Sequence, residues 1–282
     1  MKNKLGKLNL DKNYAFGVEM EFTEALQRDV GAAMRKNDKK YRKGCKLAPR
    51  DGRAARHRAV EYAKWQLTSD QSVTSNDDDG NVIGGEVISP TMDVNTQSFR
   101  EIRAMIKMLT AADAVYTSDT GYHIHLDLGD VCRVVVTAIY LKLSHDILQM
   151  HPDRYGKYML RSLINLNNTA CSSDSRLQIA MLLMNNEPDY IIGEKYNDIH
   201  FYQENAKRFL EIRFGGMVDD HDLIVAWTKT CLQIVNEAMC YTDLFEFLTE
   251  EIEYDIMSLN DRAPRVLRFT TAERLAVENM IG

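Results

Sequence analysis

The feature that most constrains the fold lies at residues 14–24, where apolar and polar side chains alternate with the period of a β-strand. Apolar residues occupy the even positions from Phe16 to Phe22, and two glutamates, Glu19 and Glu21, occupy odd positions. We therefore expect a strand that buries its apolar face and projects both glutamates from the opposite face. Taken alone, such a strand usually belongs to a sheet with one solvated face.

Three later segments repeat this polarity, because ionisable residues alternate with apolar ones in each of them. These residues are Glu86 in 84–90, His123 and His125 in 121–128, and Glu211 and Arg213 in 209–216. A His-x-His pair alone is a weak signal, because it is compatible with a zinc site, with a structural hydrogen bond or with no special role. Four strands that place like charges on one sheet face are unusual, because burying each ion costs several kcal/mol. Divalent cations offset that cost, and an oxygen-rich set with a single imidazole favours magnesium or manganese.

The rest of the chain predicts an α+β fold in one domain over residues 1–282. Apolar periodicity predicts helices over 96–113, 131–150, 155–166, 173–185 and about 220–248, the last beginning a helical C-terminal part. We also expect a strand within 63–73 that ends in a polar turn, a further turn at 76–81, a short strand at 114–118 and a polar stretch before 209.

A basic segment interrupts this pattern at about 26–62. Twelve lysines and arginines lie between Arg28 and Arg58, against three acids, and glycine and proline break the run. We interpret it as an insertion of loops and short helices outside the sheet. Its charge suggests an anionic or macromolecular partner, whereas a solvated loop is the alternative.

Composition limits the other classes of function. The net charge of −6 argues against a chain that binds nucleic acid through its whole surface. No stretch approaches the about 20 apolar residues that cross a bilayer, so we expect no membrane association. No apolar segment follows the basic N-terminus, so we expect no secretory signal. Five dispersed cysteines without a CxxC pair favour a reducing, cytoplasmic location and idle thiols over catalytic ones.

The spacing of Glu211 and Arg213 adds a chemical indication. Two residues apart on a strand, their side chains share one face, and arginine can hold a phosphate bidentately beside a metal ion. This arrangement suits phosphoryl transfer from ATP, which depends on positioning and charge neutralisation. The sequence contains no P-loop, so a nucleotide must bind by another route.

In this order, the motifs resemble the amidoligase family of the carboxylate–amine ligase superfamily, which also contains glutamine synthetase and γ-glutamylcysteine synthetase. The matching segments are GVEMEF (17–22), Trp65 with Asp70 and Ser72, GEVISP (85–90), GYHIHLDL (121–128) and LEIRFGG (210–216). The resemblance implies a glutamine-synthetase-like curved, mostly antiparallel catalytic sheet with helices packed on its outer side.

The resemblance also implies a role for each matching residue, with ATP and two or more Mg²⁺ or Mn²⁺ ions as cofactors. Glu19 and Glu21 would ligate different ions, Glu86 one ion, His123 another, and Glu211 the ion near the γ-phosphate. His125 would approach the phosphates of ATP, and Arg213 would stabilise the phosphoryl group during transfer. The implied enzyme is an ATP-dependent amide-forming ligase: ATP phosphorylates a carboxylate, and an amine displaces the phosphate.

Some residues are carried over less directly. In glutamine synthetase an aspartate–serine loop precedes the strand with the glutamate pair, whereas Asp70 and Ser72 follow it here. We therefore treat Asp70 as a candidate to orient or deprotonate the amine. Arg154 is a candidate to bind a carboxylate or a phosphate, or else a surface arginine. Further candidates to line the pocket are Tyr196, Asn197 and His200.

Two other functions stay open. A metal-dependent hydrolase would use the same carboxylates with a metal-bound water and no ATP, but the Glu-x-Arg pair and the shortage of histidines argue against it. A nucleic-acid-binding module would use residues 28–58, but that segment has little aromatic interleaving.

Overall fold

The structure is a computed structural model that describes residues 15–41, 65–142, 199–204 and 207–242, together with Ile147 and Met150. It divides into two compact units. The sheet unit comprises Asn9–Gly129 and Tyr202–Cys231, and the second unit comprises the other segments. The prediction of one domain over the whole chain stays a prediction.

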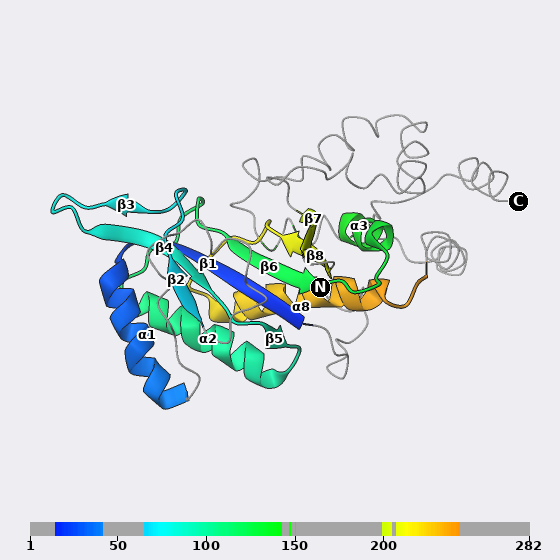
Figure 1. The fold of residues 1–282 in the computed structure, drawn as a ribbon, viewed down its shortest axis with the longest axis horizontal. Helices are drawn as coiled ribbons and strands as arrows, with labels where there is room; N and C mark the ends of the chain where they lie inside the picture. Colours follow the sequence, from blue (N-terminus) through cyan, green and yellow to red (C-terminus); the bar gives the residue numbers. More distant parts are fainter. Residues whose placement is uncertain are drawn as a thin grey trace, which may run out of the picture. The chain divides into compact units, whose positions relative to one another are not determined.

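The fold of the described part is α+β, with a mostly antiparallel, open sheet of eight strands and four helices. The strands are β1 (Ala15–Leu26), β2 (Gln66–Thr68), β3 (Ser75–Asn76), β4 (Val82–Ile88), β5 (Met92–Asp93), β6 (Tyr122–Asp127), β7 (Ile199–Glu204) and β8 (Lys207–Ile212). Their order is β2-β4-β1-β6-β8-β7, while β3 pairs with β4 and β5 with β1 (Figure 1). β1 therefore lies between β4 and β6, the two strands that carry the next ionisable residues.

The even-numbered residues of β1 form the core of the sheet unit, as their alternation predicts. Val18, Met20 and Phe22 are fully buried, and each such side chain contributes about 1.5–3 kcal/mol when it leaves water. Helices α1 (Gln27–Tyr41) and α2 (Thr96–Thr110) lie together on one side of the sheet (Figure 1). The ring of Phe99 in α2 lies 6.4 Å from that of Phe16, so α2 covers the apolar face.

The first part of α8 (His221–Ala238) packs on the same apolar face. The hydroxyl groups of Tyr122 on β6 and Thr228 on α8 are hydrogen-bonded at 2.8 Å, and both residues are fully buried. Gly215 leaves room for the Trp227 indole, because a Cβ there would lie 2.4 Å from its Nε1. The opposite face of the sheet is thereby left to the odd-numbered residues.

Several predicted elements have different bounds in the structure. The strand expected within 63–73 is confined to β2, because a turn follows in which the amides of Val73 and Thr74 donate to Asp70 O. The short strand at 114–118 is reduced to one bridge between Thr23 and Val115. β7 replaces part of the expected polar stretch, and α1 is the described part of the basic segment. α2 begins at its Asn95 cap, as its periodicity indicates.

The second unit contains α3 (Arg133–Lys142), within the helix predicted at 131–150. The Arg133 guanidinium lies 6.0 Å from the centre of the Phe201 ring, a cation–π contact. The helices predicted at 155–166 and 173–185 lie outside the described residues, as do 42–62 of the basic segment. None of the described helices is long and apolar enough to span a membrane.

Candidate metal centre

Strand pairing brings the ionisable residues of the four predicted segments onto one face. Glu19 lies opposite His123, and Glu21 lies opposite Glu86. His125 lies opposite Glu211 on the next pair of strands. Side chains directly opposite one another in an antiparallel pair share a face, so these residues gather on the face away from α2.

His123 lies at the centre of three carboxylates. Its Nδ1 is 3.2 Å from Glu19 Oε2 and 3.9 Å from Glu211 Oε1, and its Nε2 is 3.8 Å from Glu21 Oε1. Gly121 makes this arrangement possible, because a Cβ there would lie 2.3 Å from His123 Nε2. The backbone amide of Gly121 donates to Glu21 Oε2 at 2.5 Å, which holds the Glu21 carboxylate beside the His123 imidazole.

His125 connects the same cluster to an aromatic pair. Its Nε2 lies 3.1 Å from Glu19 Oε1, and its Nδ1 lies 3.1 Å from the hydroxyl of Tyr202, whose ring stacks on Phe209. Burial alone would lower the pKa of His125, but the charges of Glu19 and Glu211 raise it to about 9. Without a metal ion, His125 therefore carries the positive charge that the carboxylates require.

The carboxyl groups respond to their surroundings in opposite directions. Burial raises the pKa of Glu86 well above its usual value, and the charges of Glu19 and Glu21 raise it further. Burial would also raise the pKa of Glu19, but His125 and His123 lower it well below its usual value. Of these two carboxyl groups, Glu86 is thus the one whose negative charge is not compensated by its surroundings.

The donor set of this cluster fits divalent cations. Two groups have ligand atoms that all lie within 4.8 Å of one another: Glu19, Glu86 and His123 form one, and Glu19, His125 and Glu211 form the other. Each group offers two carboxylates and one imidazole, and every member is buried. Such oxygen-rich sites suit Mg²⁺ or Mn²⁺, and a cation would offset the charge that burial makes costly.

These groups differ from the roles carried over from the resemblance. Glu86 and His123, expected on different ions, fall in the same group, and His125, expected at the phosphates, falls in the other. Glu21 is 3.8 Å from His123 but belongs to neither group found among the described residues.

Arg213 follows β8 and is anchored to the cluster. Its Nη1 bonds to Glu211 Oε1, and its side chain is 20% exposed, compared with 8% for Glu211. Burial would lower the pKa of Arg213, but Glu211, Glu19 and Glu21 raise it, so it remains a cation. Its guanidinium therefore borders the carboxylates while staying partly open.

Asp70 and Ser72 lie in the loop between β2 and β3, at the Glu86 end of the cluster. Thr68, where β2 ends, pairs with Glu86, and the charge of Asp70 contributes to raising the pKa of Glu86. Asp70 Oδ1 accepts bonds from both the amide of Ser72 at 2.8 Å and its hydroxyl at 2.6 Å. Ser72 thus orients the Asp70 carboxylate.

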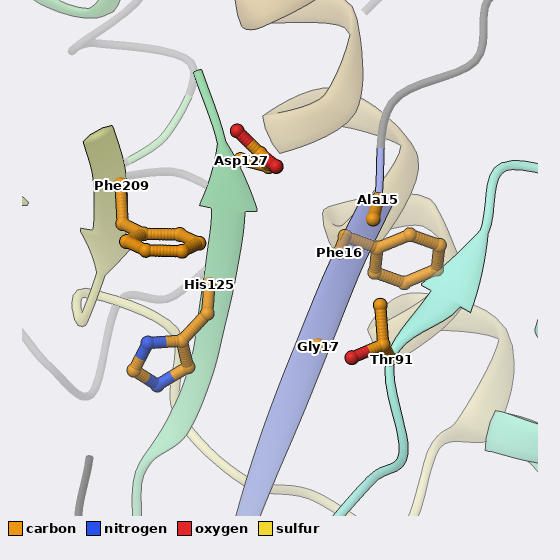
Figure 2. Close-up of a pocket in the computed structure, with 7 residues that line it drawn as sticks. All are labelled: Ala15, Phe16, Gly17, Thr91, His125, Asp127 and Phe209. Atoms are coloured by element: carbon orange, nitrogen blue, oxygen red, sulfur yellow. The ribbon is translucent and has the colours of Figure 1, made fainter. Parts of the chain in front are cut away.

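A small hollow, with a cavity volume of about 10 Å³, lies at the other end of the cluster. Figure 2 shows the side chains of His125 and Phe209 on one side, Thr91 and the first residues of β1 on the other, and Asp127 at one end. The full lining is Ala15, Phe16, Gly17, Thr91, His125, Asp127 and Phe209. Ala15 and Gly17, the small residues of β1, leave the space that the Phe209 ring borders.

Sequence reasoning did not identify this hollow as part of the site. Alternation in 121–128 already places Asp127 on the face of His123 and His125, and the odd-numbered positions of 14–24 could have extended that face to Ala15. Tyr202 was missed with its strand. Of the other candidates, His200 lies on β7 within the second unit, and Arg154, Tyr196 and Asn197 lie outside the described residues.

Comparison with protein families places the chain in a known family. The family model described as "Putative amidoligase enzyme" matches residues 12–235, which include every strand of the described sheet. No curated protein matches the chain in sequence.

Proposed function

The chain belongs to the amidoligase family, whose model covers residues 12–235, and we propose that it is an ATP- and magnesium-dependent ligase joining a carboxylate to an amine. Family membership makes it an enzyme of the amide-forming ligase class, with a carboxylate and an amine as the implied substrates. ATP dependence and an acyl-phosphate intermediate are the finer parts of the proposal. Phosphorylation would give the carboxylate the leaving group that it lacks.

One observation carries the proposal: two buried carboxylate–imidazole groups share Glu19, and Arg213 is bonded to Glu211 beside them. These groups would hold magnesium or manganese ions, which supply charge neutralisation to a polyphosphate. An amide hydrolase that uses a metal-bound water has no comparable need for a guanidinium beside a metal ligand.

Arg213 would contact the phosphoryl group during its transfer, in the transition state. Its planar guanidinium has several N–H donors in a fixed fork, and the bond to Glu211 restricts its orientation. Charge that builds up on the transferred phosphoryl oxygens is stabilised most when such donors are already in place. We therefore assign Arg213 to transition-state stabilisation rather than to ground-state binding.

The hollow beside His125 supports a nucleotide as the phosphoryl donor. Its lining includes the Phe209 ring, which stacks on Tyr202 at 5.2 Å and is 3% exposed, so a planar base would stack there once the hollow widens to admit it. Asp127 offers a carboxylate to sugar hydroxyls at the end of the hollow. A nucleoside in this position would direct its phosphates toward the carboxylate–imidazole groups.

The opposite end of the cluster suits the amine. Asp70 is held by Ser72 near Glu86, and a carboxylate there can orient an ammonium group and accept its proton. The carboxylate substrate would then meet the γ-phosphate between the two ends. We also propose a reducing, cytoplasmic location, because Cys132, Cys231 and Cys240 are unpaired in the described part of the chain.

The test is ADP release by the purified protein with ATP, magnesium, and a panel of carboxylates and amines. Turnover should require both substrates and should be abolished in Glu19→Ala and Glu211→Ala. Turnover that survives either substitution would contradict the proposal. Cleavage of an amide without ATP would indicate a metal-dependent hydrolase instead.

A further inference from the structure

β1 ends in an irregularity that determines where the next residues lie. Its register with β4 shifts between Phe22 and Leu26, and Glu24 within this bulge has a φ of 63°, a left-handed conformation that is uncommon for a non-glycine residue. After the bulge, Leu26 pairs with Ile83, and α1 begins at Gln27. The bulge therefore brings Gln27 beside the start of β4.

Gln27 joins two segments that carry candidate catalytic groups. Its Nε2 donates to Gly84 O at 2.8 Å and to Ser69 Oγ at 3.1 Å. Gly84 lies two residues before Glu86, and Ser69 lies immediately before Asp70. One side-chain amide thus links the strand of Glu86 to the loop of Asp70.

The loop rests directly on two glycines. A Cβ on Gly84, whose φ is 71°, would lie 2.1 Å from Val73 O, and a Cβ on Gly85, whose φ is 153°, would lie 2.8 Å from Thr68 O. A side chain at position 84 would push the loop away from β4, and one at position 85 would push away the end of β2, from which the loop starts. The close approach of loop and strand therefore depends on both glycines.

The loop is also internally fixed. The amide of Thr74 donates to Asp70 O at 2.8 Å, and the amide of Asp70 donates to the Thr74 hydroxyl at 3.0 Å. A loop closed by such bonds moves as a unit. Its attachment to β4 consequently decides where the Asp70 carboxylate lies relative to Glu86.

We propose that Gln27 is a positioning residue that holds Asp70 at the amine end of the site. Gln27 acts through the loop and touches no reacting atom. The inference rests on the proposed function, in which Asp70 orients and deprotonates the amine. Neither the alternation of the sequence nor the family motifs assign a role to Gln27.

The test compares Gln27→Met, which keeps length and removes the donor, with Gln97→Met as the matched control. Gln97 also lies in the first turn of a helix, and its Nε2 donates to Glu101, four residues further along the same helix, at 3.2 Å. The full-length proteins are compared by hydrogen exchange of peptides covering 68–76 and by Mn²⁺ affinity. Kinetics use a carboxylate from the panel that supports ADP release, with ammonium or hydroxylamine as the amine probe.

Ammonium is protonated at neutral pH and depends on a base, whereas hydroxylamine is largely neutral and does not. In Gln27→Met we expect exchange in the loop to be about tenfold faster and kcat/KM for ammonium to fall about tenfold. Turnover with hydroxylamine, the KM for ATP and Mn²⁺ affinity should each stay within about twofold, as should every value for Gln97→Met.

Unchanged exchange in Gln27→Met would overturn the proposal, and so would equal losses with both amines, which indicate general damage. If wild-type protein releases ADP with no combination of carboxylate and amine in the panel, the ligase assignment fails, and the role of Gln27 in amine use fails with it. If loop exchange is nevertheless faster in Gln27→Met, the contact between Gln27 and the loop is supported and only the assigned reaction is wrong.

Discussion

Glu19 and His123 face each other directly across the β1–β6 pair, with 3.2 Å between Glu19 Oε2 and His123 Nδ1. The second oxygen of Glu19 lies 3.1 Å from His125 Nε2, so this one carboxylate contacts both imidazoles of the His-x-His strand. It is also the residue shared by both candidate ligand groups. Loss of Glu19 should therefore weaken the binding of both ions, whereas loss of Glu86 or of Glu211 should weaken the binding of one.

This relationship predicts the stoichiometry of metal binding. Glu19→Gln removes a ligand from both groups, so we expect Mn²⁺ affinity to fall about a hundredfold for every ion that binds. Glu86→Gln should weaken one ion and leave the other unchanged. Titration calorimetry with Mn²⁺ measures both, and Glu101→Gln, an exchange on α2, is the control. Two unperturbed ions in Glu19→Gln would exclude the shared ligand.

The stability of the metal-free protein should fall as pH rises. The pKa of His125 is raised to about 9 in the folded state, from an ordinary value of 6.5. Its contribution, on the order of 3 kcal/mol, is complete below pH 6.5 and is lost as pH rises through 9. The raised pKa of Glu86 acts in the same direction above its ordinary value of 4.5.

Thermal unfolding with a chelator between pH 6 and 10 measures this effect. We expect Tm to decline across the range and to decline less in His125→Gln. Magnesium or manganese should flatten the profile, because a bound cation replaces the charge of the imidazolium. A metal-free Tm that is constant or rises with pH would refute the assignment of the charge to His125.

Arg213→Lys should lower kcat more than it raises KM. Lysine keeps the charge but loses the planar fork, so the loss should fall on the transition state, by roughly a hundredfold in kcat, with the KM for ATP changed less than about threefold. Arg208→Lys is a matched control on β8, because Arg208 donates to Gly129 O instead. A larger KM for ATP with unchanged kcat would assign Arg213 to binding.

Phe209→Leu should weaken binding of the nucleoside part of ATP and leave binding of its phosphates unchanged. Loss of one base–aromatic stack costs about 1–3 kcal/mol, so the KM for ATP should rise about tenfold or more. Inhibition by inorganic tripolyphosphate, which has no base, should be unchanged. Equal weakening of ATP and tripolyphosphate would show that the hollow does not hold the base.

Strand alternation was sufficient to predict which residues share the site face. In β1 and β6 the apolar residues had to face the helices, which left Glu19, His123 and His125 together on the other side. Alternation does not specify which strands become neighbours. The grouping of Glu86 with His123 follows from the position of β1 between β4 and β6, which local sequence does not encode.

The missed parts of the site have a similar cause. β7 contains Tyr202 within a short polar sequence whose strand character depends on pairing with β8, so neither the strand nor the tyrosine contact with His125 was predicted. The polar turn after β2 was predicted, but the hydrogen bonds that Asp70 makes to Ser72 and Thr74 within it were not, because periodicity does not detect them.

The pairing of β6 with β8 has a consequence for the order in which the protein becomes active during synthesis. Ile124 pairs with Ile212, so a long stretch of chain must leave the ribosome between the two strands. The carboxylates of β1 and β4 are made early, whereas Glu211 and Arg213 are made late. A nascent chain that has not yet added β8 therefore holds acids without the arginine that accompanies them. Catalytic competence should arise in one late step of translation, when β8 docks on β6.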